Sequence, residues 1–192
     1  MQVTSPREDS KPALRRLLRA SRPDFDSQLA QSSAIRGHLR KWLAEHPARV
    51  IAAFSSIPGE PLLLPLLADL PDRQWVLPRM EGESLVFHFT DAAAVAAFPA
   101  NRFGILEPPA DSPVCPTEQI ALFLCPGMAF TRGGKRLGRG KGFYDRALSA
   151  ADSEAIRVGV SFREQVLAEL PVELHDLPMH FLATADGIAK CG

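Results

Sequence analysis

The sequence predicts an open α/β fold in which a mostly parallel sheet is covered by helices. Short apolar runs recur along the chain, as expected of strands that are buried on both faces. Stretches of helical periodicity separate several of these runs. The chain has 192 residues, of which 46% are hydrophobic, and this is enough for one substantial core. We therefore expect residues 11–192 to form a single domain after a flexible tail at residues 1–10.

Two helical patterns open the chain. Residues 11–20 place three leucines on one stripe with arginines around it, which predicts an amphipathic N-terminal helix. A second helix is expected over about residues 26–45, because apolar residues recur with helical spacing and Pro47 follows shortly afterwards. Its apolar members are Leu29, Ile35, Leu39, Trp42 and Leu43.

Strands and helices alternate through the rest of the chain. Residues 49–54 form a short apolar run between turn residues, which predicts the first buried strand. Further strands are expected at residues 74–77, 85–89, 120–125, 157–160 and 181–184. Helices are expected near residues 61–70, 92–97, 142–150 and 164–170. The proline-rich stretch at 107–116 is interpreted as a long loop inside one domain, because its flanking strands lack the apolar surface for two cores.

Composition argues against several classes of protein. Lys and Arg total 22, as do Asp and Glu, so no overall field attracts nucleic acid or an anionic membrane. The N-terminus lacks the apolar run of a signal peptide, and no apolar stretch is long enough to span a bilayer. Cys115, Cys125 and Cys191 show neither metal-ligand nor disulfide spacing, which favours a reducing cytoplasm. We expect a soluble, cytoplasmic protein, with a monomer as the default.

The most informative segment spans residues 120–146 and joins an apolar strand, a Pro-Gly turn, a glycine-rich stretch and a helix. Glycines let backbone N–H groups approach an anion closely, and a helix N-terminus adds partial positive charge. The interleaved Lys and Arg side chains suit a polyphosphate. A flexible basic loop on a solvated surface is an equally good interpretation of these residue types alone. The place of the loop favours phosphate binding, because it begins at the carboxyl end of the predicted strand, where ligands of open α/β sheets lie.

The text PGMAFTRGGKRLGRGKGFYDR within this segment resembles the signature of the 5-formyltetrahydrofolate cyclo-ligase family. The resemblance extends over most of the chain, including Lys11 with LRRLLRA, residues 54–60, residues 77–79, residues 103–108 and residues 170–176. It implies three α/β/α layers, and an enzyme that uses ATP and Mg²⁺ to cyclise 5-formyltetrahydrofolate to 5,10-methenyltetrahydrofolate. ATP would phosphorylate the formyl oxygen, so that a neighbouring amine displaces phosphate without any protein nucleophile.

The resemblance also implies roles for individual residues. Lys11 and Arg15, four apart on one helix face, would reach the ATP phosphates. Asp145 and Asp176 would bind magnesium, and Glu60 would bind the N–H groups of the folate ring. The ATP phosphates would be held by Arg136, Leu137, Gly138, Arg139, Gly140, Lys141, Gly142, Phe143 and Tyr144, of which Arg136, Lys141 and Tyr144 are the catalytic candidates. Arg79, Phe103 and Glu107 are expected in the pocket wall or in packing.

The sequence departs from the usual family text at four places, of which the first adjoins the expected folate contact at Glu60. Residues 61–64 read Pro-Leu-Leu-Leu where an acid and a threonine are common. Thr131 and His180 stand where aspartates are frequent, and Phe143 replaces a common tyrosine. The phosphate segment itself is unchanged.

Other side chains and other functions are weaker candidates. His38, His46 and His88 are interpreted as surface or core residues, and Cys125 as a small buried residue rather than a thiolate. One alternative function is an α/β protein that binds a nucleotide or sugar phosphate without folate chemistry. Another is a module that grips RNA backbone, although zero net charge and 7% aromatic content disfavour it.

Overall fold

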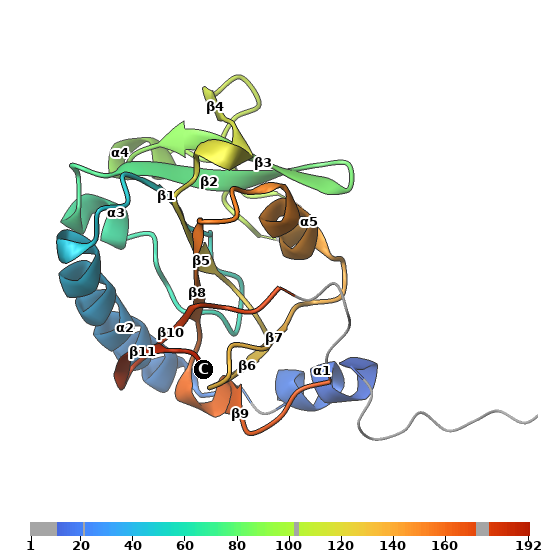
Figure 1. Ribbon diagram of the computed structural model, residues 1–192. Coiled ribbons are helices and arrows are strands. Elements are labelled where there is room, and N and C mark those ends of the chain that lie inside the picture. The colour runs from blue at the N-terminus through green and yellow to red at the C-terminus, as the bar shows by residue number, and fades with distance from the viewer. Residues whose placement is uncertain (1–10, 21, 102–103, 172–176) are drawn as a thin grey trace, which may run out of the picture.

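An eight-stranded sheet runs through the described part of the chain, residues 11–20, 22–101, 104–171 and 177–192 of a computed structural model (Figure 1). Its strand order is β11-β10-β8-β5-β1-β2-β3-β4. Neighbouring strands from β10 to β2 are parallel, and the pairs at both edges are antiparallel. The strands are β1 (Val50–Ala52), β2 (Gln74–Glu81), β3 (Ser84–Thr90), β4 (Val114–Cys115), β5 (Leu122–Cys125), β8 (Ile156–Val160), β10 (Phe181–Thr184) and β11 (Gly187–Lys190). The expected mostly parallel α/β sheet is confirmed.

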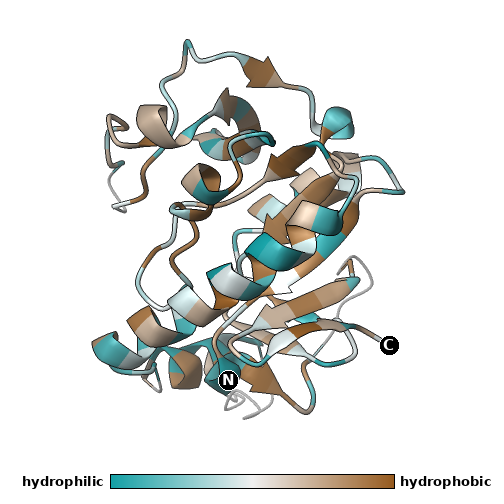
Figure 2. Ribbon diagram, turned by 90° about the vertical axis from the view of Figure 1, so that its left-hand side faces the viewer, coloured by the Kyte–Doolittle hydropathy of each residue, from teal (hydrophilic) through white to brown (hydrophobic). Residues whose placement is uncertain are grey.

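Helices cover both faces of this sheet, giving three layers. On β5, Leu122 and Leu124 pack into the core beneath α2 (Phe25–Glu45), whereas Phe123 and Cys125 join the core beneath α5 (Phe143–Ala150). This alternation follows from the pleat of a strand, which sends successive side chains to opposite faces. Figure 2 shows α2 lying across the first of these faces.

The long helix α2 agrees with its expected position because its start, face and end are all encoded locally. The side chain of Asp24 accepts a hydrogen bond from the backbone N–H of Ser27 at 2.9 Å and caps the first turn. Ile35, Leu39 and Leu43 recur on one side and are fully buried. None of the helices in the described ranges is long and apolar enough to cross a membrane.

A smaller three-stranded sheet supports the glycine-rich segment. It consists of β7 (Arg136–Leu137), β6 (Ala129–Thr131) and β9 (Val166–Leu167), in that order. Helix α1 (Lys11–Ala20) lies beside it in Figure 1 and packs Leu14 and Leu18 against its core. The N-terminal helix is thereby placed next to the basic segment, far away in sequence.

Several expected elements need correction. The helix expected at residues 164–170 is wrong, because a short 3-10 helix η2 (Arg163–Gln165) leads into β9, which pairs with β6. Residues 129–137 form a hairpin instead of a plain loop, and β4 and β11 were not foreseen. The helix expected at 61–70 shrinks to α3 (Leu66–Asp69) after Pro65, and that at 92–97 to α4 (Ala92–Val95). A second 3-10 helix is η1 (Thr117–Gln119).

Candidate active site

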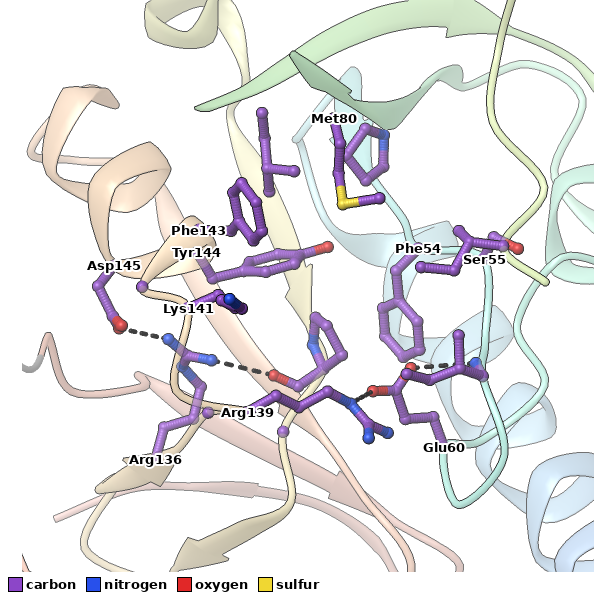
Figure 3. A pocket seen from close by; sticks show the side chains of 18 of the residues that line it. Phe54, Ser55, Glu60, Met80, Arg136, Arg139, Lys141, Phe143, Tyr144 and Asp145 are labelled. Carbon is purple, nitrogen blue, oxygen red and sulfur yellow. Dashed lines mark hydrogen bonds and ion pairs between the residues drawn. The ribbon is translucent and has the colours of Figure 1, made fainter. Parts of the chain in front are cut away.

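A pocket opens at the carboxyl ends of β1 and β5, where ligands of open α/β sheets are expected (Figure 3). Phe54 and Ser55 follow β1, and Pro126 and Gly127 follow β5. The glycine-rich segment and the start of α5 form the opposite wall. From that wall come Arg136, Gly138, Arg139, Lys141, Gly142, Phe143, Tyr144 and Asp145. Most of the phosphate-binding candidates are therefore gathered in one cavity.

Glu60 and Arg139 form an ion pair inside this pocket. The Nε atom of Arg139 donates to Oε1 of Glu60 at 2.9 Å, and the N–H of Ile57 donates to Oε2 at 3.2 Å. The side chain of Glu60 is only 6% exposed, compared with 30% for Arg139. Burial raises the pKa of Glu60 above its ordinary value, and the charge of Arg139 partly opposes that rise. The sequence predicted a functional role for both residues but not their contact.

A second ion pair joins Arg136 and Asp145. A terminal nitrogen of Arg136 donates to Oδ1 of Asp145, and the other terminal nitrogen donates to the carbonyl of Pro126 at 3.2 Å. The guanidinium carbon lies 5.8 Å from the centre of the Tyr144 ring. Arg136 thus links β7, the end of β5 and α5, with only 5% of its side chain exposed. Glu60 and Asp145, the two acidic candidates that line the pocket, are therefore each paired with an arginine of the glycine-rich segment.

The N-terminus of α5 faces the pocket with Gly142 at its cap. Gly142 adopts φ 68°, a left-handed conformation, and a Cβ there would lie 2.8 Å from the Arg146 guanidinium. The first N–H groups of a helix have no acceptor within the helix and carry partial positive charge. Lys141 is exposed immediately before them. This end of the pocket suits an anion.

Helix α1 is tied to the glycine-rich segment through Arg15. Its Nε atom donates to the carbonyl of Gly138 at 2.8 Å, and its guanidinium lies against Gly140. Lys11 lies one turn earlier on the same helix and is half-buried. Neither Lys11 nor Arg15 is among the residues that line the pocket, and Arg15 reaches the phosphate segment only through Gly138 and Gly140.

Other candidates lie elsewhere. Leu137 is buried in the core beneath α1, and Asp176, His175 and Phe103 lie outside the described residues. His180 accepts a hydrogen bond from the Arg157 backbone at 3.1 Å between β8 and β10, away from the pocket. Burial raises the pKa of the Cys125 thiol to about 12, as expected for a structural cysteine.

Comparisons with known proteins agree with this geometry. The profile of the 5-formyltetrahydrofolate cyclo-ligase family matches residues 7–185. A 5-formyltetrahydrofolate cyclo-ligase of Mycolicibacterium smegmatis is 34% identical over 200 residues, covering 96% of this chain and 97% of that protein. One of Escherichia coli is 29% identical over 179 residues, covering 89% and 96%. The chain belongs to the 5-formyltetrahydrofolate cyclo-ligase family.

A solved structure supports the same assignment at the level of the fold. The NMR structure of the 5,10-methenyltetrahydrofolate synthetase of Aquifex aeolicus superposes with a TM-score of 0.82 and 27% identity. The match covers 94% of this chain and 92% of that one. The family assignment therefore holds for nearly the whole chain and not only for the glycine-rich motif.

The apolar half of the pocket of this cyclo-ligase family member was not predicted. It comes from the segment after β1, from the β2–β3 hairpin and from the loop between α4 and β4, and its members are Phe54, Ile57, Pro78, Met80, Leu85 and Ile105. Glu107 also lines the pocket and accepts a hydrogen bond from the Met80 N–H at 3.2 Å, which fits its expected place in the wall. Arg79 instead donates to the carbonyl of Pro108. The position of residues 54–57 just after a buried strand was the available signal.

Proposed function

We propose that the chain catalyses the ATP- and magnesium-dependent cyclisation of 5-formyltetrahydrofolate to 5,10-methenyltetrahydrofolate, with release of ADP and phosphate. The observation that carries this proposal is the pocket in which Arg136, Arg139 and Lys141 meet the buried carboxylate of Glu60. Cations suit a polyphosphate, and the acid and the apolar walls suit a flat ring with N–H donors. Family membership supports the pairing of these two ligands in one site.

The triphosphate of ATP binds along residues 136–144, with Lys11 and Arg15 approaching from α1. Phosphate oxygens replace the carboxylates of Glu60 and Asp145 as partners of Arg139 and Arg136, because both arginines already point into the pocket. The backbone N–H groups at the start of α5 add further donors. Arg136 and Lys141 then stabilise the charge on the transferred phosphoryl group.

The reduced folate binds on the other side of the pocket. Once Arg139 contacts phosphate, the carboxylate of Glu60 is available to accept the N–H groups of the pterin ring. Phe54, Met80 and Phe143 provide apolar surface against which a ring packs and from which water is excluded. Water must be excluded because it would compete with the amine for the activated carbon.

Magnesium fits the same wall. Asp145 stands in the first turn of α5 beside the phosphate segment, and Asp176 is its proposed second ligand. Mg²⁺ commonly takes one or two carboxylates together with phosphate oxygens and water. An ion held there by Asp145 and Asp176 would neutralise part of the phosphate charge.

Cyclisation then needs only groups that the two substrates supply. The formyl oxygen attacks the γ-phosphorus and ADP leaves. The neighbouring amine attacks the formyl carbon, the carbon–oxygen bond breaks, and phosphate departs with the former formyl oxygen while the amine proton is lost. The protein's part is to orient the reacting atoms and stabilise negative charge, which requires no protein nucleophile.

A cytoplasmic, monomeric protein without nucleic-acid partners completes the proposal. Cys115, Cys125 and Cys191 are all free thiols, which is compatible with a reducing compartment. ATP and the reduced folate are its proposed small-molecule partners.

The test is an assay that follows the absorbance of the methenyl product when purified protein is mixed with ATP, Mg²⁺ and 5-formyltetrahydrofolate. Control reactions omit each component in turn. Lys141→Ala should raise the KM for ATP about tenfold or more while leaving that for folate nearly unchanged, because a charge-assisted phosphate contact is lost. Lys135→Ala is the matched control, since Lys135 is exposed on the same segment outside the pocket. A folded protein without ATP-dependent product would contradict the proposal.

A further inference from the structure

The hydroxyl of Tyr144 is buried in the pocket without a hydrogen-bond partner among the described residues. Tyr144 lies in the first turn of α5; the residue as a whole is half-buried, and its hydroxyl oxygen is inaccessible to solvent. Figure 3 shows the ring extending from α5 into the pocket, with Met80 and Phe143 on one side and Lys141 and Arg136 on the other. The oxygen points away from the helix, into the cavity.

This hydroxyl is a neutral donor. A phenol ordinarily keeps its proton at neutral pH, so its O–H group can donate a hydrogen bond. A buried O–H group without an acceptor is unfavourable, because it has lost its hydrogen bonds to water and no protein group replaces them. A ligand that offers an acceptor at this point would satisfy the group, so the orphaned donor marks a contact to substrate.

The surroundings indicate which substrate provides the acceptor. Phosphate has better partners in the exposed Lys141 and the half-exposed Arg139. The apolar side chains of Met80 and Phe54 near the hydroxyl make the burial of an additional anion costly, whereas a carbonyl oxygen loses much less on leaving water. A neutral phenol next to apolar walls therefore matches a carbonyl-type oxygen.

We infer that the Tyr144 hydroxyl donates a hydrogen bond to a carbonyl oxygen of the reduced folate, either the formyl oxygen or the ring carbonyl. This inference rests on the proposed function and refines it. The backbone of Tyr144 belongs to the phosphate segment, while its hydroxyl binds and positions the other substrate. Tyr144 thus spans both halves of the pocket.

Binding of three ligands to Tyr144→Phe tests the inference. Affinities for 5-formyltetrahydrofolate, 5-methyltetrahydrofolate and ATP are measured by titration calorimetry. Loss of one hydrogen bond should weaken 5-formyltetrahydrofolate binding about three- to tenfold and leave ATP binding unchanged. A loss confined to the formyl compound supports the formyl oxygen as acceptor, and an equal loss for both folates supports the ring carbonyl. Unchanged affinity for both folates, or a loss confined to ATP, overturns the inference.

Stability and a second hydroxyl provide the controls. Ser161 also has a buried hydroxyl without a partner among the described residues, but it does not line the pocket, so Ser161→Ala should leave all three affinities unchanged. Ligand-free Tyr144→Phe should unfold at the wild-type temperature or above. A lower unfolding temperature would mean that the hydroxyl has a partner within the chain and would overturn the inference. Absence of turnover in the wild type would refute the proposed function, whereas normal turnover with an unaffected Tyr144→Phe refutes this inference alone.

Discussion

Replacing Arg139 with alanine leaves the carboxylate of Glu60 buried without its cationic partner. Removing one member of a fully buried ion pair costs about 3–5 kcal/mol of folding free energy, whereas an exposed pair contributes about 0–1 kcal/mol. Glu60 is 6% exposed and Arg139 is 30% exposed, so this pair lies between the two cases. We expect Arg139→Ala to lower the free energy of unfolding by about 2 kcal/mol at neutral pH.

The loss should depend on pH in a definite direction. Burial raises the pKa of Glu60 in the folded chain, so the protonated form favours folding and stability falls as pH rises through the folded-state pKa. Arg139 opposes that rise in pKa, and its removal therefore enlarges the fall. The difference between wild type and Arg139→Ala should be small near pH 4, where Glu60 is largely protonated in both, and reach its full size by pH 8.

Urea unfolding followed by circular dichroism between pH 4 and pH 8 measures this difference. Arg163→Ala is the matched control, because Arg163 pairs with Asp186 at 2.7 Å but both side chains are at least half-exposed. The control should lose less than about 1 kcal/mol. A difference for Arg139→Ala that is the same at every pH would refute the assigned electrostatic role of the pair.

Three further outcomes test other parts of the structure. Asp145→Asn should raise the magnesium concentration needed for half-maximal activity about tenfold, and an unaltered magnesium titration would exclude Asp145 as a ligand. Gly134→Ala should destabilise the fold by about 2 kcal/mol in urea unfolding, because φ is 85° there and a Cβ would lie 2.5 Å from the Met179 carbonyl; wild-type stability would contradict this. Cys125 should resist iodoacetamide at pH 8 in the folded protein, since burial raises its pKa to about 12, whereas half-exposed Cys191 should react; mass spectrometry distinguishes the two.

Locally encoded elements were predicted well from the sequence. Helix α2 has its cap, its apolar stripe and its stop within the same 25 or so residues, and the strand β5 is a continuous apolar run. Their expected bounds differ from the observed ones by only a few residues. The bounds of such elements depend little on the rest of the fold, which is why they can be predicted from a single sequence.

Elements that depend on pairing with distant parts of the chain were not predicted from the sequence. Residues 164–170 have helical composition, yet Val166 and Leu167 pair with β6, and the Gln165 side chain is buried where its amide donates to the Gly59 carbonyl at 2.8 Å. The first contact joins Phe130 to Val166, 36 residues further on, and the second joins residues that are 106 apart. Local periodicity carries no information about contacts over such separations. Tertiary structure therefore overrode a local preference.

The candidate site was predicted in composition but not in arrangement. The family resemblance supplied Glu60 and the phosphate segment, and the structure adds that Arg139, 79 residues along the chain, holds Glu60 before any ligand binds. The orphaned Tyr144 hydroxyl likewise emerges only when the pocket walls are assembled. Charge pairing and burial decide what these side chains do, and both are properties of the fold.

The fate of the formyl oxygen tests the central claim most directly. If the pocket holds ATP so that its γ-phosphoryl group activates the formyl group, substrate labelled with ¹⁸O in the formyl oxygen should transfer that atom to the released phosphate. Mass spectrometry of the phosphate should then find one labelled oxygen per molecule of methenyl product. Label found in water instead, with unlabelled phosphate, would contradict activation by phosphoryl transfer.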